Sequence, residues 1–369
     1  MSRSKCTVRD VILQPTTLCN WDCDYCYLPD RRHAQEMLPL VARSVADTLR
    51  RQASDAPVNL CWHGGEPLTL GVQRFSELVR HFEGLNVTHR VQTNASLVDE
   101  RWCDLFAQHG FRVGVSLDGR DHDNRHRVDR VGRPTADKAL RGIERLTDAG
   151  FPISLIAVVS DPSPGRARRL YETAVDLGCV WLGVNIEETE GVNQRRTQVR
   201  FEQAVEFWAE LANAWRKNPV LQLRDVGRVL AYAQQLLDHG SATAPPIDPL
   251  PTVAWNGDVT LISPELAGFS SPEWGQFACG NVLRSDLAEL VVQGMNAPWV
   301  RQHQRGVDRC RTSCGYFDFC GGGHPANRIF EHGRLDEPET DYCRSGKQAL
   351  MEGVVSLVDD RLAEAHPAA

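Results

Sequence analysis

The chain has 369 residues, of which 42% are hydrophobic and 24% are charged, and its formal net charge is −7. This composition is typical of a soluble globular protein large enough for two domains, and the acidic balance argues against a nucleic-acid-binding protein. The first ten residues contain no apolar signal-peptide core, and no run approaches membrane-spanning length. Twelve cysteines without a secretion signal indicate a reducing, cytoplasmic location, where thiols bind metals more often than they form disulfides.

The first two thirds of the chain alternate short apolar segments with amphipathic ones. This alternation predicts βαβ units and a parallel sheet, and six such units fit a partial TIM-like (β/α)6 barrel. A doubly wound sheet has the same local pattern, so periodicity alone leaves that alternative open. The expected strands span 8–14, 58–62, 89–94, 111–117, 152–160 and 180–186, and the expected helices span 38–52, 72–82, 98–109, 135–149 and 166–177.

The last third of the chain reads as a second, cysteine-rich domain. Two helices, at 199–217 and 221–238, are expected without a strand between them, and the proline-rich segment 239–251 reads as a linker. A hairpin is expected around Asn256-Gly257, followed by a loop-rich cysteine region. The predicted boundaries are 7–240 for the barrel, 252–350 for the cysteine-rich domain, and a final helix that reaches residue 363.

The first predicted strand runs into Cys19, Cys23 and Cys26, spaced C-x3-C-x2-C. Three thiolates can hold three irons of a cubane [4Fe–4S] cluster and leave the fourth iron open for a small molecule. This spacing, with Tyr25 just before the third cysteine, resembles the signature of the radical S-adenosylmethionine (SAM) superfamily. A structural zinc loop is the alternative, but zinc needs a fourth ligand nearby, and His33 lies seven residues beyond the third cysteine.

Polar residues follow the other predicted strands, and the carboxyl ends of parallel strands face one mouth of a barrel. Glycine lets the backbone approach a ligand closely, and a glutamate accepts hydrogen bonds from an ammonium group. The superfamily resemblance implies that the Gly-Gly-Glu run after the second strand holds the SAM amino group, and that three further residues contact its carboxylate or ribose. The implied cofactor-binding residues are Tyr25, then Gly64, Gly65 and Glu66, then Asn94, Ser116 and Arg127.

A second cysteine group, Cys310-x3-Cys314-x5-Cys320 and then Cys343, lies near the C-terminus. Four thiolates suit a fully coordinated [4Fe–4S] cluster, and a four-cysteine zinc site is the alternative. The arrangement resembles the SPASM extension of peptide-modifying radical SAM enzymes, although its first cysteine pair is one residue wider than usual. A second auxiliary cluster would need cysteines where this chain has Ser263 and His324. We therefore expect one auxiliary cluster.

Longer stretches look like one branch of this superfamily, the cyclophane-forming radical SAM/SPASM peptide maturases of the GrrM/OscB type. They include His63-Gly64-Gly65-Glu66-Pro67, Asn185-Ile186-Glu187-Glu188, Ser263-Pro264-Glu265-Leu266 and Tyr316-Phe317-Asp318-Phe319-Cys320-Gly321-Gly322-Gly323. The resemblance implies a ribosomally made precursor peptide as substrate and a C–C bond between an aromatic ring and the β-carbon of a nearby residue. A reductase such as flavodoxin or ferredoxin is the expected partner, and neither nucleic acid nor a membrane is.

Such a reaction needs a radical, an electron acceptor and a base. Reductive cleavage of SAM supplies a 5′-deoxyadenosyl radical that removes a β-hydrogen, after which the carbon radical attacks the ring. Rearomatisation then releases one electron, for which the auxiliary cluster is a plausible acceptor, and one proton. Glu265 is the first choice as base, followed by Glu187 or Glu188, although an acidic pair is often only a solvated loop. Asp118 is a further catalytic candidate or else a turn residue.

Several alternatives stay open at this point. The same motifs suit a radical SAM epimerase, a thioether former, or a maturase that oxidises a Cys or Ser as sulfatase maturases do. A zinc-binding scaffold without activity is the non-enzyme alternative. The arginines from Arg125 to Arg133 either receive acidic residues of a precursor peptide or form a solvated loop.

Overall fold

Six parallel strands form the centre of the molecule in the computed structural model, which describes residues 7–52, 56–195 and 199–365, with side chains as far as residue 357. Their order in the sheet is the order of the chain, with no reversal. A doubly wound sheet requires such a reversal, so the fold is the barrel-like α/β arrangement. The strands are β1 (Asp10–Leu13), β2 (Val58–Trp62), β3 (Val87–Thr93), β4 (Arg112–Ser116), β5 (Ile153–Val159) and β6 (Trp181–Ile186).

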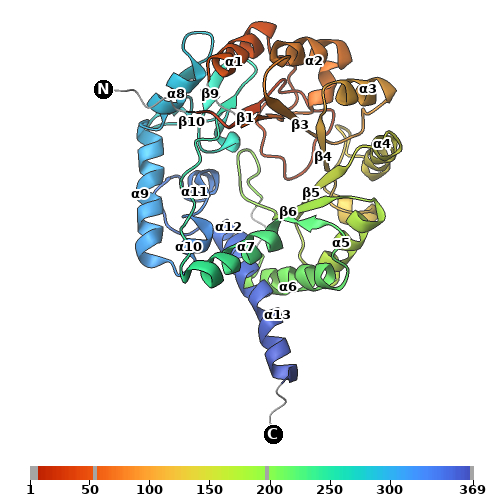
Figure 1. The fold of residues 1–369 in the computed structure, drawn as a ribbon, viewed down its shortest axis with the longest axis vertical. Helices are drawn as coiled ribbons and strands as arrows, with labels where there is room; N and C mark the ends of the chain where they lie inside the picture. Colours follow the sequence, from red (N-terminus) through yellow and green to blue (C-terminus); the bar gives the residue numbers. More distant parts are fainter. Residues whose placement is uncertain (1–6, 53–55, 196–198, 366–369) are drawn as a thin grey trace.

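Helices cover the outer side of this curved sheet (Figure 1). Each presents one apolar stripe to the strands; for example, Ala139, Ile143 and Leu146 of α4 are buried at a helical spacing. Asp99 caps the helix after β3 by accepting a hydrogen bond from the Trp102 amide. The helices are α1 (Pro39–Arg51), α2 (Val72–Val79), α3 (Glu100–Gln108), α4 (Ala136–Asp148), α5 (Arg166–Asp176) and α6 (Phe201–Lys217).

A short strand that the sequence analysis did not predict separates the two helices after β6. This strand, β7 (Gln222–Leu223), pairs in parallel with β6, and α7 (Arg224–His239) begins directly after it. The expectation that no strand lies between these helices was therefore wrong. Two residues are too few to show the alternation by which a strand is recognised.

The second half of the molecule extends the barrel sheet beyond β1. The predicted hairpin is present as β8 (Thr252–Val253) and β9 (Asp258–Thr260), which pair antiparallel. β8 also pairs in parallel with β1, with Thr252 opposite Ile12 and Val253 opposite Leu13. β12 (Gly280–Asn281) continues the sheet on the far side of β9, while β10 (Ser270–Ser271) and β11 (Gly275–Gln276) form a separate ribbon.

The cysteine region is largely helical, which contradicts the expectation that it is rich in loops. The longest of its helices, α9, buries Trp299, Val300, His303 and Val307 on one face. The last helix packs along α6 and α7, and so returns the chain to the barrel. The helices are α8 (Leu287–Gly294), α9 (Pro298–Ser313), α10 (Phe317–Cys320), α11 (Pro325–His332), α12 (Asp341–Cys343) and α13 (Ala349–Ala365). Within the described ranges, none of the helices has the length and apolarity that crossing a membrane requires.

Candidate functional site

A cavity of about 410 Å³, here called the barrel cavity, brings together most of the residues predicted for the site. Its lining comes from the ends of the parallel strands, from the cysteine loop after β1, and from the second half of the chain. Among the residues predicted for the SAM site and for catalysis, Gly64 and Asp118 do not line it. The predicted residues that do are Cys19, Cys23, Cys26, Tyr25, Gly65, Glu66, Asn94, Ser116, Arg127, Glu187, Glu188 and Glu265.

The cysteine loop is fixed to its surroundings by backbone hydrogen bonds. The Cys19 amide donates to the Arg31 carbonyl at 2.8 Å, and the Glu66 amide donates to the Leu18 carbonyl at 2.7 Å. Burial raises the pKa of all three thiols, to about 12 for Cys23. Buried thiols with one shared cavity have the donor chemistry of an iron–sulfur site, where metal binding displaces the protons. Among the described residues, no three His, Cys, Asp or Glu side chains are close enough to hold a metal ion, so the fit rests on donor type and shared cavity.

The two glycines after β2 are required by the protein's own packing. At Gly65, where φ is +60°, an added Cβ would lie 2.5 Å from the Leu18 carbonyl oxygen. At Gly64, where φ is +103°, it would lie 2.9 Å from Cγ of Gln14. Only glycine adopts such a backbone freely at so close an approach. The close approach of Gln14 and Leu18 is therefore enough to require glycine at both positions.

Glu66 is buried at the edge of the barrel cavity, with both carboxylate oxygens hydrogen-bonded. They accept from the Leu68 amide at 3.1 Å, the Thr93 hydroxyl at 2.7 Å and the Asn94 amide at 2.7 Å. Burial nevertheless raises the pKa of Glu66 to about 7, since these donors offset only part of the desolvation. A cationic group in the cavity would favour the ionised carboxylate.

Asp118 lies behind the cavity wall, where it forms a buried ion pair. Its carboxylate accepts from Nε of Arg127 at 2.9 Å, from the Val158 amide at 2.8 Å and from the Tyr25 hydroxyl. The Arg127 guanidinium also lies 5.5 Å from the centre of the Tyr25 ring. The structure therefore does not bring Asp118 into the cavity, against its candidacy as a catalytic residue, and gives it the geometry of a residue that positions two lining side chains.

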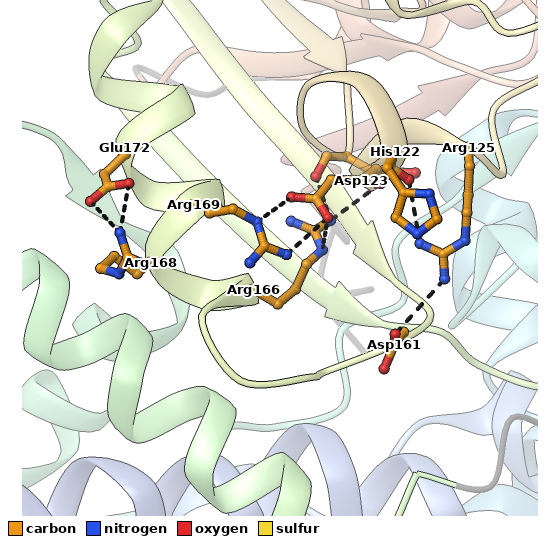
Figure 2. Close-up of polar contacts among 9 residues, drawn as sticks. His122, Asp123, Arg125, Asp161, Arg166, Arg168, Arg169 and Glu172 are labelled. Carbon is orange, nitrogen blue, oxygen red and sulfur yellow. Dashed lines mark hydrogen bonds and ion pairs between the residues drawn. The ribbon is translucent and has the colours of Figure 1, made fainter.

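Arginines of α5 and of the segment after β4 are paired with carboxylates (Figure 2). Asp123 accepts from Arg169 at 2.9 and 3.1 Å and lies 3.6 Å from Arg166. Arg125 lies 3.9 Å from Asp161. Further along the predicted basic run, His126 contacts Asp24 and Arg130 donates to the Cys19 carbonyl. The run therefore does not form one free basic face, and part of it holds the cysteine loop.

Further carboxylates, those of Glu187, Glu188, Glu190 and Glu265, line the barrel cavity. His324 lies between two of them, with Nδ1 3.6 Å from Glu190 and Nε2 3.9 Å from Glu265. Glu188 accepts from the Asn327 side-chain amide at 2.8 Å. Burial, reinforced by repulsion from neighbouring carboxylates, raises the pKa of Glu188 and Glu190. The sequence analysis missed Glu190, although an acidic residue two positions beyond Glu188 in the same turn was a usable signal.

Glu187 is the third carboxylate at the end of β6. Its side chain is 1% exposed, with one oxygen 3.8 Å from Arg195 and 3.3 Å from the Asn193 amide. Its other oxygen has no hydrogen-bond partner among the described residues. Buried polar atoms are almost always paired in native proteins, so this oxygen is available to a group that enters the cavity.

The four C-terminal cysteines line another cavity, of about 360 Å³, here called the second cavity. The ends of α9, α10 and α12 supply them, so the loops between these helices bring distant cysteines together. The Thr340 hydroxyl donates to the Cys343 sulfur at 3.2 Å, and burial raises the pKa of the Cys343 thiol to about 11. Four thiols around one space have the donor chemistry of a fully coordinated [4Fe–4S] cluster.

An arginine that the sequence analysis did not single out reaches this cysteine group from α11. Arg328 is completely buried, and its guanidinium donates to the Cys310 sulfur at 3.1 Å and to Nδ1 of His303 at 3.0 Å. Burial, together with the nearby guanidinium, lowers the pKa of His303 to about 3, so the imidazole is neutral and accepts this hydrogen bond.

The two cavities are separated by a thin wall. His324 and Tyr342 line the barrel cavity, while their chain neighbours Gly323 and Cys343 line the second cavity. Consecutive Cα atoms are about 3.8 Å apart. Residues 323–324 and 342–343 are therefore two places where adjacent residues line different cavities.

Comparison with known proteins agrees with this geometry. A sequence profile described as the radical SAM superfamily matches residues 13–162. An uncharacterised protein of Synechocystis sp. is 32% identical over 95% of this chain and 92% of its own length. The serine-type anaerobic sulfatase-maturating enzyme of Klebsiella aerogenes is 30% identical over 84% of this chain and 77% of its own length.

Solved structures share the fold at lower sequence identity. The structure of anSMEcpe with bound AdoMet is 19% identical and has a TM-score of 0.73 over 95% of this chain and 98% of that one. Streptococcus suis SuiB bound to its precursor peptide SuiA is 16% identical and has a TM-score of 0.68, covering 92% of this chain and 76% of that one.

The protein is a radical SAM enzyme. Within that superfamily it belongs to the family that includes the anaerobic sulfatase-maturating enzyme of Klebsiella aerogenes, which shares sequence with it over most of both chains. Its cofactors are accordingly SAM and a [4Fe–4S] cluster, and the expectation of an enzyme is confirmed over that of a zinc scaffold without activity.

Proposed function

We propose that this enzyme is a maturase that forms a C–C bond within a ribosomally made precursor peptide, between an aromatic ring and the β-carbon of a nearby residue. The sequence motifs of the GrrM/OscB type support the proposal, as does the fold shared with peptide-bound SuiB. The observation that carries it is the pair of cavities with a shared wall. Ring coupling must release a proton and an electron, and a carboxylate-lined cavity beside a four-thiol cavity offers a destination for each.

The cysteine loop and the strand ends would hold the cofactors. Cys19, Cys23 and Cys26 would bind the cluster that, with SAM, supplies a 5′-deoxyadenosyl radical for removing the substrate β-hydrogen. Glu66 would accept hydrogen bonds from the SAM ammonium group, because no cationic side chain among the described residues pairs with its buried carboxylate. Asn94, Ser116 and Arg127 line the same cavity and would contact the SAM carboxylate or ribose.

Glu265 is our proposed acceptor of the proton that the ring loses. It lies in a short turn (Pro264–Leu266) after the hairpin, and its carboxylate reaches the barrel cavity beside His324. Nδ1 of His324 in turn lies 3.6 Å from Glu190. Glu187 is the second choice. Glu188 is less available as a base, because burial raises its pKa and favours its protonated form.

Cys310, Cys314, Cys320 and Cys343 would hold one auxiliary [4Fe–4S] cluster, which would supply an electron acceptor next to the substrate. The reaction then balances. One substrate hydrogen leaves in 5′-deoxyadenosine, and the other leaves as a proton and an electron. Because SAM cleavage consumes one electron and rearomatisation returns one, the crosslink needs no net reductant after the first turnover. Flavodoxin or ferredoxin is the proposed source of the first electron.

We assign these roles to two domains, with the barrel at 7–240 and the cluster domain at 252–350. The supporting observation is that α7 ends at His239 and β8 begins at Thr252. The last helix, α13, follows the cluster domain in the chain but packs on α6 of the barrel.

The experiment is anaerobic co-expression with the small open reading frame adjacent to the gene, followed by mass spectrometry of the peptide. A ring–β-carbon bond removes one hydrogen from each joined residue, so the product should be lighter by two hydrogens. Tandem fragmentation should fail between the joined residues, and a hydrazide probe should find no carbonyl. Solvent deuterium at an α-carbon without mass loss in ordinary water would instead indicate an epimerase.

Oxidation of a Cys or Ser to formylglycine is the second candidate. The similarity to the Klebsiella aerogenes sulfatase-maturating enzyme over 84% of this chain favours it. This reaction also removes two hydrogens from Ser, so mass alone does not separate the candidates. A product that reacts with a hydrazide, formed from a sulfatase-derived peptide, would replace the crosslinking proposal and leave the radical SAM assignment intact.

A further inference from the structure

We propose that Arg328 is the counter-ion of the auxiliary cluster and raises its reduction potential, so that the cluster accepts an electron from the substrate. The inference rests on the proposed function in one respect, namely that the second cavity holds a cysteine-bound [4Fe–4S] cluster. Arg328 would not touch substrate or the reacting atoms. Its role would be electrostatic, exerted through the cysteine sulfurs.

The first observation is the position of the guanidinium. Nη2 of Arg328 donates to the Cys310 sulfur at 3.1 Å. The same nitrogen lies 3.3 Å from the point where a Cβ on Gly323 would be, and the Cys343 sulfur lies 3.3 Å from that point too. Arg328 therefore approaches two of the four cysteines from the side of α11.

The second observation is that the Arg328 guanidinium has no carboxylate partner among the described residues. The guanidinium is completely buried, and its other hydrogen bonds go to neutral groups, the imidazole of His303 and the carbonyls of His303, Gly322 and Leu335. Nε has no partner in the described part of the chain. No ion pair joins Arg328 to a described Asp or Glu within 4.0 Å.

A buried cation without an anion is costly, and proteins avoid it by pairing. Four thiolates around a [4Fe–4S] core carry net negative charge, so the loaded second cavity would supply the missing anion. The neighbouring helix is also shaped for the guanidinium: a Cβ on Gly306 of α9 would lie 2.5 Å from Nη1 of Arg328. The glycine keeps that space open for the side chain.

The expected consequence is a cluster that is easier to reduce. The potential of an iron–sulfur cluster depends on nearby charge, hydrogen bonds to its sulfurs and exposure to solvent. A buried guanidinium that donates to a ligand sulfur stabilises the reduced, more negative form through the first two effects. An acceptor of higher potential is what removal of an electron from the coupled ring requires.

The test uses full-length protein in which Cys19, Cys23 and Cys26 are all replaced by Ala, so that only the second cluster is measured. Its midpoint potential is determined by redox titration followed by electron paramagnetic resonance, with and without Arg328→Gln. Loss of the charge should weaken one-electron uptake at least about tenfold, which corresponds to a midpoint about 59 mV lower. The rise in unfolding temperature on cluster loading should also be smaller in R328Q.

Two further variants separate charge from architecture. Arg328→Lys keeps the charge, so its potential should remain nearer to that of the parent than to that of R328Q. Arg309→Gln is the matched control, because Arg309 precedes Cys310 in the chain but pairs with Asp336 and is half-exposed. It should leave the potential unchanged.

An unchanged potential in R328Q would overturn the proposal. So would loss of iron from folded R328Q and R328K alike, because that result would indicate a packing role. Iron retained by R328K but not by R328Q would support the counter-ion role. The proposed function fails separately: absence of iron in the parent variant would remove the auxiliary cluster, and a peptide without a crosslink would leave the potential measurements standing.

Discussion

Each cysteine cavity has a buried arginine, and the two arginines differ in what neutralises them. Arg127 of the barrel cavity pairs with Asp118 at 2.9 Å, with side chains that are 8% and 2% exposed. Arg328 of the second cavity has no carboxylate partner in the described ranges. The protein itself thus neutralises Arg127. For Arg328, the proposed auxiliary cluster would supply the neutralising charge.

Removal of either cysteine set should produce the largest effect and the sharpest distinction between the cavities. Reconstituted enzyme should contain about eight irons, and replacing Cys19, Cys23 and Cys26 by Ala should leave about four and abolish SAM cleavage. Replacing the four C-terminal cysteines should also leave about four irons, while 5′-deoxyadenosine still forms and the crosslink does not. Iron analysis and chromatography measure these outcomes, and about twelve irons in the parent would show that a further cluster exists.

The next effect separates radical formation from proton removal within the barrel cavity. Glu265→Gln should still produce 5′-deoxyadenosine, because Glu265 is not part of the proposed SAM contacts. Crosslinked peptide should fall by about 10²- to 10⁴-fold, the usual contribution of a general base. Mass spectrometry quantifies both products in one reaction. Unchanged crosslinking would transfer the role to Glu187 or to water.

Breaking the buried ion pair between Asp118 and Arg127 should show how much it contributes to the stability of the protein. Asp118→Asn would leave the Arg127 charge buried and uncompensated, which typically costs about 3–5 kcal/mol of unfolding free energy. Urea denaturation of the cluster-free protein measures this loss. Asp161→Asn is the control, because its pair with Arg125 spans 3.9 Å and its side chain is 57% exposed. An exposed pair contributes about 0–1 kcal/mol, and equal losses in the two variants would contradict the interpretation.

The smallest effect is a pH dependence confined to the barrel cavity. Burial raises the pKa of Glu66 to about 7, so below that pH the carboxyl is mostly protonated and cannot pair with an ammonium. SAM affinity should be constant above about pH 7 and fall by roughly tenfold per unit well below it, with protons released on binding. Calorimetry in two buffers of different ionisation enthalpy measures both the SAM affinity and the number of protons released. Glu66→Gln should bind weakly at every pH, and a parent affinity independent of pH would argue against this contact.

The parts of the fold that could be predicted are those with a local period. The six βα units follow from alternating apolar and amphipathic segments, and the predicted second strand, 58–62, matches β2. β7 was missed because two residues show no period. α9 was missed because its sequence is dominated by polar residues; its buried stripe, from Trp299 to Cys310, becomes apparent only when it packs.

The residues of the candidate site likewise divide into those that could be predicted from the sequence and those that could not. Cys19, Cys23 and Cys26 lie on one loop, so their spacing alone indicates the chemistry. Glu190 and Arg328 could not be assigned this way, because their meaning depends on residues far along the chain. His324, which contacts Glu190, is 134 positions away, and the approach of Arg328 to Cys310 depends on how α11 packs against α9. Nothing local distinguishes Arg328 from a solvated arginine on an ordinary amphipathic helix.

The pairing of β8 with β1 has a consequence for how a peptide reaches the site. β1 leads directly into the cysteine loop, and its main chain is hydrogen-bonded to the hairpin of the second half, with the Gln14 amide donating to the Val253 carbonyl at 2.9 Å. Separating the two halves would break the hydrogen bonds between β1 and β8. It would expose β1 as an unpaired edge strand, a surface prone to aggregation. We therefore expect the substrate to enter the barrel cavity without separation of the two halves. We also expect a truncated barrel that ends before β8 to aggregate.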